Sequence, residues 1–175
     1  MPYLFTSPRL GFRRYQSSDF DRLCELNADP AVMEFFPSTL DEAGTKEMVE
    51  HIAQQFTPEG FGWYAVDRLD TDTFIGLIGF LRPRYEAPFH PPVEIGWRLH
   101  KDAWGQGFAT EGAKACLEFG QPTLGLNKVF SYTPVPNRRS ERVMQKLGME
   151  KVGTFEHPLI AEGHWLRTHV LYCWE

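Results

Sequence analysis

Residues 99–112 read Leu-His-Lys-Asp-Ala-Trp-Gly-Gln-Gly-Phe-Ala-Thr-Glu-Gly, and this stretch decides the fold. An apolar strand pattern ends at Leu99, two glycines follow at Gly105 and Gly107, and a helical pattern begins directly after them. Glycine permits backbone conformations that a Cβ atom would block. The N–H groups of residues 106–110 would then lie at the positive end of a helix, where anions bind. The stretch predicts either an anion-binding loop or simply a tight strand-to-helix turn.

Two familiar phosphate-binding motifs do not fit this stretch. A Rossmann fingerprint requires Gly-x-Gly-x-x-Gly, but Thr110 stands at the third glycine position and Gly112 comes two residues late. A P-loop requires Gly-Lys followed by Ser or Thr, and the chain contains no such triplet. The sequence therefore disfavours NAD and ATP as ligands.

The strand that precedes the loop has two different faces. Because side chains alternate along a strand, Glu94, Gly96 and Arg98 point one way, and their neighbours Val93, Ile95, Trp97 and Leu99 point the other way. Residues 73–81 are apolar on both faces, which predicts a central strand.

The rest of the chain alternates between helical and extended patterns. Helical spacing covers residues 20–29, 39–58, 109–119 and 138–147, and a proline is expected to stop the first two helices. Extended patterns cover residues 9–15, 61–67, 73–81, 93–99, 128–133 and 164–174, with one more strand before the last. This order predicts an α/β fold in a single domain, residues 1–175, with a mixed central sheet of about seven strands flanked by about four helices.

Composition excludes several classes of function. The chain has 175 residues and 18 Lys and Arg against 23 Asp and Glu, a net charge of −5 without the basic footprint of a nucleic-acid-binding protein. Its three cysteines are far apart, and its histidines lack metal-binding spacing. No window approaches the run of about 18 apolar residues that a membrane span needs. We therefore expect a cytoplasmic protein with no metal, no membrane association and no nucleic-acid partner.

The loop resembles a known family motif. Residues 104–109, Trp-Gly-Gln-Gly-Phe-Ala, are similar to the pyrophosphate loop of the GNAT superfamily of N-acetyltransferases, Gln/Arg-x-x-Gly-x-Gly/Ala, with Trp104 in place of the leading Gln or Arg. The longer run Trp-Gly-x-Gly-Phe-Ala-Thr-Glu resembles the RimJ/RimL-like branch, the ribosomal-protein alanine N-acetyltransferases. Four further segments fit that branch: residues 6–10, 75–76, 94–97 and 137–149.

The resemblance implies acetyl-CoA as co-substrate and assigns residues to it. Main-chain groups of Trp97, Arg98 and Leu99 would face the acetyl group and the pantetheine arm, and Asn137 would hydrogen-bond the pantetheine. The pyrophosphate would lie on the loop formed by Gly105, Gln106, Gly107, Phe108, Ala109 and Thr110. Three arginines follow Asn137, and we expect one of them, with Arg142 as the candidate, to meet the 3′-phosphate of CoA. The alternative is a solvated helix face that carries Arg138, Arg139 and Arg142.

Two residues are the expected catalytic groups. An α-amine, with a pKa of about 7.7–8.0, must be neutral to attack, and Glu94 could take its proton directly or through one water. Glu94 could instead orient the substrate or pair with an arginine. Many GNAT enzymes protonate the leaving thiolate with a tyrosine, but Met144 stands at that position. The resemblance implies that the hydroxyl after Asn137 lies near the CoA sulfur, so Ser140 is the expected donor, with Tyr132 as second choice, unless Ser140 only caps its helix.

The expected activity is transfer of acetyl from acetyl-CoA to a primary amine by direct attack in a ternary complex. The acceptor would be a protein N-terminus or a small amine or amino acid, and the enzyme a possible homodimer. The alternative is a CoA-binding sensor or partner-binding module with little turnover. We expect Glu111 to be structural because a carboxylate suits the first turn of a helix. His90 could line the acceptor site or be solvent-exposed.

Overall fold

The computed structural model describes residues 3–175, apart from the side chains of residues 57–59. Eight strands form one sheet in the order β1-β2-β3-β4-β5-β6-β8-β7, and only β5 and β6 pair in parallel. The strands are β1 (Phe5–Thr6), β2 (Leu10–Arg13), β3 (Trp63–Arg68), β4 (Thr73–Leu81), β5 (Glu94–Leu99), β6 (Val129–Pro134), β7 (Glu150–Glu156) and β8 (Thr168–Trp174). The predicted mixed α/β sheet is thus confirmed, with the short β1 as an additional strand.

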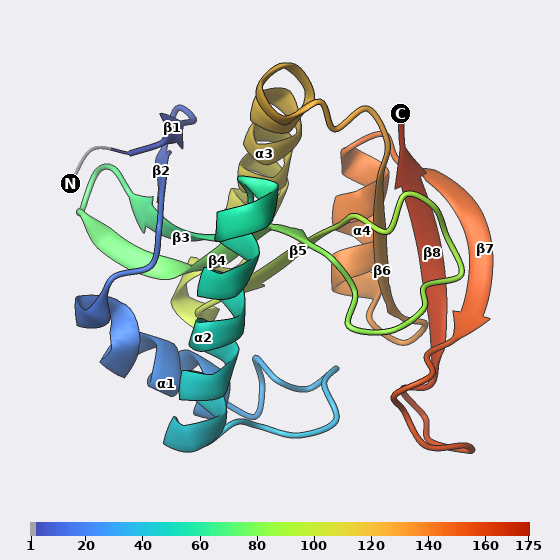
Figure 1. The fold of residues 1–175 in the computed structure, drawn as a ribbon. Coiled ribbons are helices and arrows are strands. Elements are labelled where there is room, and N and C mark those ends of the chain that lie inside the picture. The colour runs from blue at the N-terminus through green and yellow to red at the C-terminus, as the bar shows by residue number, and fades with distance from the viewer. Residues whose placement is uncertain (1–2) are drawn as a thin grey trace.

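Helices cover both faces of this sheet (Figure 1). The α-helices are α1 (Phe20–Ala28), α2 (Glu42–Glu59), α3 (Phe108–Leu124) and α4 (Arg138–Lys146), and two short 3-10 helices span Ser17–Asp19 and Lys101–Ala103. In Figure 1, α2 crosses in front of the strands while α3 and α4 lie behind them. A Cβ atom on Gly112 of α3 would come within 2.3 Å of Ile78, so this helix packs closely on the rear face.

Glycines rather than prolines end the two long helices. We expected α2 to stop at Pro58 and α3 to end near residue 119, but α2 runs through Pro58 to Glu59, and α3 contains Pro122. Proline removes the hydrogen bond of its own N–H and crowds the carbonyl four residues earlier, and close to the C-terminus of a helix both effects fall on its last turns. Each helix stops where Gly60 or Gly125 adopts the left-handed conformation, with φ of 72° and 68°.

Two other predicted boundaries are also wrong. Helix α2 begins at Glu42 instead of residue 39 because the carboxylate of Asp41 accepts the N–H of Gly44 at 2.8 Å and caps the helix there. Strand β8 begins at Thr168 instead of residue 164, since a turn closed by Arg167 N–H and His164 C=O precedes it. Among the described residues, no helix is both long and apolar enough to cross a bilayer.

Candidate active site

Strands β5 and β6 separate soon after they meet. Their register pairing is limited to Glu94 and Phe130, and the Phe130 N–H donates to the Val93 C=O at 2.9 Å. One step further, the main chain of β6 no longer reaches β5, and the Ser131 hydroxyl donates to the Ile95 carbonyl instead, at 2.9 Å. The two strands therefore open a wedge in the middle of the sheet.

The alternation of β5 decides which main-chain groups face this wedge. The carbonyls of Val93 and Ile95 point toward β6, so the main chains of Trp97 and Leu99 face the same side. The main chain of Arg98 faces β4 instead, where its register partner is Leu77. This corrects one expectation: of the three residues assigned to the pantetheine arm, only Trp97 and Leu99 direct main-chain groups into the wedge. The carbonyl of Leu99 already accepts the Trp104 indole N–H at 2.8 Å.

The glycine loop lies at the open end of the wedge and leads directly into α3. Gly105 and Gly107 have φ values of 73° and 82°, a region that favours glycine, and both are exposed. Gly107 is the N-terminal cap, so the N–H groups of Phe108, Ala109 and Thr110 start the helix without partners within it. These unpaired N–H groups and the open space around Gly105 fit an anionic ligand such as a pyrophosphate.

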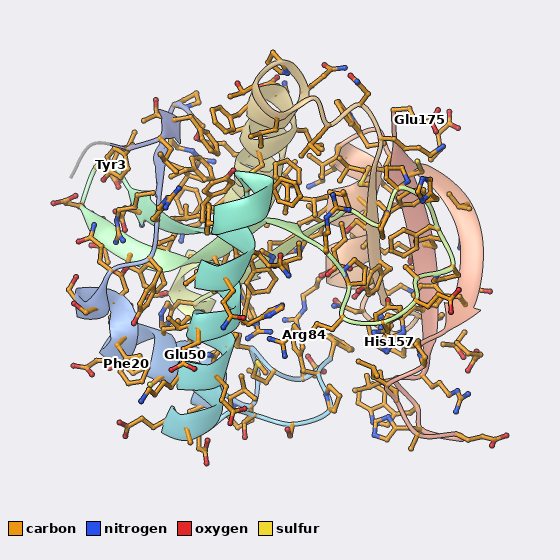
Figure 2. The ribbon with its side chains drawn as sticks, in the orientation of Figure 1. Tyr3, Phe20, Glu50, Arg84, His157 and Glu175 are labelled. Carbon is orange, nitrogen blue, oxygen red and sulfur yellow. The ribbon has the colours of Figure 1, made fainter. Side chains whose placement is uncertain are left out.

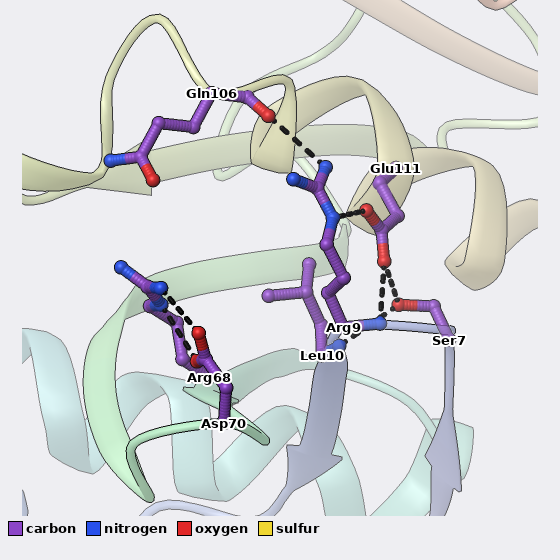
Figure 3. Close-up of polar contacts among 7 residues, drawn as sticks. All are labelled: Ser7, Arg9, Leu10, Arg68, Asp70, Gln106 and Glu111. Carbon is purple, nitrogen blue, oxygen red and sulfur yellow. Dashed lines mark hydrogen bonds and ion pairs between the residues drawn. The ribbon is translucent and has the colours of Figure 1, made fainter.

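A polar cluster fixes the loop to the start of the chain (Figure 3). Arg9 donates to the Gln106 carbonyl at 3.0 Å and to the Glu111 carboxylate at 2.6 Å, and Ser7 also donates to Glu111, at 2.7 Å. Burial raises the pKa of Glu111, but the hydrogen bonds from Ser7 and Arg9 outweigh it and lower the pKa below its ordinary value. Glu111 thus has a structural role, as expected. Its partners are the Ser7 hydroxyl and the main-chain N–H and guanidinium of Arg9. Arg9 was not singled out by the sequence, since nothing local links residue 9 to the loop.

Asn137 and Ser140 lie at the start of α4, behind β5. Asn137 caps the helix by accepting Ser140 N–H at 3.2 Å, so the alternative in which Ser140 is the cap is wrong. Asn137 also donates to the hydroxyls of Thr133 at 2.8 Å and Ser140 at 3.1 Å. A third group, the Trp97 indole, donates to the Ser140 hydroxyl at 3.3 Å. Because two donors occupy its oxygen, the Ser140 hydroxyl keeps its own proton free to donate.

The three arginines of α4 have different surroundings. Arg138 pairs with Glu141 at 2.6 Å. Arg139 pairs with Glu34 at 2.6 Å and stacks on the Trp104 ring at 4.4 Å. Arg142 is exposed and has no ion-pair partner within residues 3–175, which leaves it the freest of the three to meet a phosphate.

Glu94 lies on the opposite face of β5, next to two tyrosines. Its Oε2 atom is buried without a hydrogen-bond partner in the described part of the chain, and so is the Tyr85 hydroxyl. Burial raises the pKa of Glu94 to about 7, against an opposing effect of the Tyr132 hydroxyl. Tyr132 lies beside Glu94, on the face away from Ser140, which separates it from the α4 side of the wedge. Met144, where many GNAT enzymes have a tyrosine, is buried in the core.

The connection between β4 and β5 completes this face. It carries Tyr85, whose ring lies 4.7 Å from that of His157, at the end of β7. In the view of Figure 2, its Arg84 lies between α2 and His157. His90, in the same connection, is exposed. Tyr85 was missed because no sequence pattern shows where a proline-rich connection folds back. Residues 3–175 contain no group of three or more His, Cys, Asp and Glu side chains placed to hold a metal.

Comparison with known proteins agrees with this geometry. A family model described as an acetyltransferase (GNAT) domain matches residues 9–150. The chain is 28% identical over 160 residues to the uncharacterized N-acetyltransferase YnaD of Bacillus subtilis, covering 91% of this chain and 90% of the relative. It is 23% identical over 124 residues to a ribosomal protein uS5-alanine N-acetyltransferase of Escherichia coli, covering 71% and 61%.

Solved structures share the whole fold. A GNAT-family acetyltransferase from Bacillus anthracis superposes with a TM-score of 0.78 at 24% identity, covering 96% of this chain and 95% of the other. Spermidine N-acetyltransferase from Vibrio cholerae, solved in complex with CoA and spermine, superposes with a TM-score of 0.74 at 18% identity, covering 94% of both chains.

Proposed function

We propose that this chain, which belongs to the GNAT family of acetyl-CoA-dependent acetyltransferases, acetylates a primary amine by direct attack within a ternary complex. The observation that carries the proposal is the wedge between β5 and β6. It leaves the main chain of Trp97 open to a ligand, with Ser140 behind the sheet and the Glu94 carboxyl in front. The two faces of the wedge thus hold a group suited to each of the two proton transfers.

Acetyl-CoA supplies the acetyl group, and residues of the rear face would hold it. The N–H groups from Gly105 to Thr110 would bind the pyrophosphate, and the exposed Arg142 would meet the 3′-phosphate. The main chain of Trp97 would hydrogen-bond the acetyl and pantetheine region. Asn137 has both amide hydrogens engaged by Thr133 and Ser140, so its contact with the pantetheine would use its oxygen.

Glu94 is suited to accept the proton of the attacking amine. Its pKa of about 7 lies close to that of an α-amine, about 7.7–8.0, so proton transfer between them costs little. As the amine nitrogen bonds to the acetyl carbon, the carbon–sulfur bond breaks and the electron pair stays on sulfur. The free proton of Ser140 would then pass to that thiolate, and the Ser140 oxygen would regain a proton from water, while Glu94 releases the proton of the amine to water, so that both residues end as they began.

The acceptor belongs to the same proposal. A protein N-terminus is supported by the 23% identity to the uS5-alanine N-acetyltransferase and by the RimJ/RimL-like run of residues 104–111. A small amine is supported by the fold shared with the spermidine enzyme. Both acceptors would approach from the face that carries Glu94, since the rear face is taken by α3 and α4.

The test is a turnover assay with product mass spectrometry, using acetyl-CoA with small amines and with a peptide that has a free N-terminal alanine. A ligand at about 100 times its Kd adds about 2.7 kcal/mol of stability, so acetyl-CoA also raises the melting temperature. A rise with acetyl-CoA but no acetylated product would contradict the proposal and favour a CoA-binding sensor.

Substitution of the donor sharpens this test. Ser140→Ala lowers kcat about tenfold, because the thiolate then leaves without an adjacent proton, and leaves the KM for acetyl-CoA within about twofold. Ser18→Ala, an exposed serine before α1, is the matched control and leaves both constants unchanged. Unchanged turnover in Ser140→Ala would remove the donor role.

A further inference from the structure

Arg98 is a buried arginine on the acceptor side of the sheet. It lies on β5 two residues beyond Gly96, on the same face as Glu94, and is 8% exposed. Its Nη1 atom donates to the Asn27 side chain on α1 at 2.7 Å and contacts the Met48 sulfur on α2 at 3.3 Å. The rings of Phe36 and Trp63 lie 4.2 Å and 5.3 Å from its guanidinium carbon.

No carboxylate of residues 3–175 balances this charge. Arg98 takes part in no ion pair, and its Nε atom is buried without a hydrogen-bond partner. Nη2 also has no partner, since every hydrogen bond of this side chain uses Nη1. Burial alone lowers the pKa of Arg98 to about 10. A buried charge is normally paired, because leaving water costs several kcal/mol.

Arg13 shows what the vacant edge of Arg98 can bind. It points to the same face of the sheet from β2, and its Nε and Nη2 atoms grip the Asp67 carboxylate at 2.6 and 2.8 Å. These two nitrogens form the planar edge that matches both oxygens of a carboxylate. The same pair of nitrogens is unoccupied in Arg98.

The neighbouring indole adds a second unused donor. The Trp63 Nε1 atom is buried without a partner and lies beside Gly96, between Glu94 and Arg98 along the strand. One end of this face therefore offers donors that need an acceptor, and the other end offers the free Glu94 oxygen and the Tyr85 hydroxyl. This polarity matches a molecule with an amine at one end and an anion at the other.

We propose that the Nε–Nη2 edge of Arg98 binds a carboxylate of the acceptor, so that the substrate is an amino acid or another amine that carries an acid group. This inference rests on the proposed function, because it takes Glu94 as the group that receives the amine. This acid is not a phosphate of CoA. The α4 helix, which carries the proposed CoA contacts, meets the Trp97 side chain, and Trp97 lies on the opposite face of β5 from Arg98. The Phe36 ring, on the α1–α2 connection, lies over the guanidinium carbon, and Nε is buried, so we propose that this connection shifts to admit the acid.

Strand geometry limits the length of the acceptor. Residues 94 and 98 are four apart, which is about 13 Å along an extended strand. The test therefore compares acids of different lengths with their neutral amides: phenylalanine, 4-aminobutanoate and 6-aminohexanoate, each beside its amide, with phenethylamine as the acid-free reference.

The expected result is an acid preference that depends on Arg98. In the wild type, kcat/KM for the preferred acid exceeds that for its amide at least tenfold. Arg98→Met reduces the preference to within about twofold, through the KM of the acid. Arg98→Lys keeps the charge without the fork and gives an intermediate preference.

Arg22→Met is the matched control. Arg22 is a half-exposed residue of α1 paired with Glu25 at 2.7 Å, so its replacement removes the same charge and keeps the preference. Equal turnover of every acid and its amide by the wild type would overturn the inference and uphold acetyl transfer to amines. If no compound is acetylated, the melting temperature is measured with CoA and either N-acetylphenylalanine or its amide. The inference is overturned if the acid raises the melting temperature no more than the amide does. It is also overturned if Arg98→Met shows the same shifts as the wild type.

Discussion

Arg13 and Arg98 lie in one row across the sheet, yet their surroundings are opposite. The register runs from Arg13 to Ala65, Leu77 and Arg98 over β2, β3, β4 and β5. Arg13 donates to the carboxylates of Asp19 and Asp67 in four contacts of 2.6–2.8 Å, which raise its pKa in spite of burial. Arg98, three strands away, has no carboxylate and a lowered pKa.

The same contrast separates the two regions around these arginines. In the N-terminal region, Glu111 has Ser7 and Arg9 as partners, and Arg13 has two aspartates. Around the wedge, four of the six described side chains that have a buried polar atom without a hydrogen-bond partner gather on one face: Trp63, Tyr85, Glu94 and Arg98. The other two are Tyr64, which packs against Phe5 and Phe12, and His100, beyond the end of β5. Among the charged groups of these two regions, Arg13 and Glu111 have partners within the fold, whereas we propose that Glu94 and Arg98 are kept for a substrate. This difference separates the charged side chains that stabilise the fold from those that we propose to bind the substrate.

The largest expected effect is on stability, from Arg13→Met. This change leaves Asp19 and Asp67 buried, 4% and 5% exposed, without their cation. Removing one partner of a buried pair costs about 3–5 kcal/mol. Arg98→Met removes a charge that has no ionic partner and changes stability by only about 1 kcal/mol, the cost of the hydrogen bond to Asn27. Urea unfolding at pH 7 measures the free energy of unfolding of both variants. Equal losses of stability would contradict the contrast between Arg13 and Arg98.

The second effect is on catalysis, from Glu94→Gln. The amide cannot take the amine proton, so kcat falls about 100-fold or more, and the rise of rate with pH near 7 disappears. Glu118→Gln, an exposed residue of α3, serves as the control and leaves the profile in place. A kcat within threefold of the wild type, with an unmoved pH profile, would assign Glu94 to substrate orientation instead.

The sequence predicted local features of this contrast and missed the long-range ones. Alternation along β5 placed Trp97 and Arg98 on opposite faces, and the structure confirms it through their contacts with Ser140 and Asn27. The separation of β5 and β6 depends on how two segments far apart in the sequence pack together. The alternation of residues within one strand does not predict it. The vacancy at Arg98 is likewise invisible in sequence, since Asp19 and Asp67 could have paired with either arginine until the register was known.

The third effect is on the pH dependence of stability. The folded chain keeps a proton on Glu94 up to about pH 7, whereas the unfolded chain releases it near the ordinary pKa of 4.5. Glu94 therefore stabilises the fold below pH 4.5, and this contribution is lost as pH rises to 7, by at most about 1.4 kcal/mol per pH unit. In Glu94→Gln, this loss is absent, so stability rises more, or falls less, between pH 4.5 and 7 than in the wild type.

His157 gives the opposite sign and serves as the control. Burial lowers its pKa to about 4, so the unfolded chain takes up a proton below pH 6.5 that the folded chain takes up only near pH 4. Stability from this group is present above pH 6.5 and is lost as pH falls to 4. His157→Gln removes that loss. Urea unfolding at half-unit intervals between pH 4.5 and 7 separates the two variants, and parallel curves for Glu94→Gln and wild type would show that Glu94 titrates normally.

The smallest effect carries the comparison to the cofactor side. Among the arginines of α4, Arg138 and Arg139 already have carboxylates at 2.6 Å, whereas Arg142 has none within residues 3–175. If a missing partner marks a ligand contact, Arg142→Ala raises the Kd for acetyl-CoA about threefold, as expected for one exposed charge pair, and Arg138→Ala changes it less. Screening reduces the difference at high salt, so calorimetry at 50 and 500 mM NaCl measures it. Equal effects of the two variants would show that a missing ion-pair partner marks a ligand contact only for buried groups. Exposed side chains are hydrated whether or not a ligand binds them.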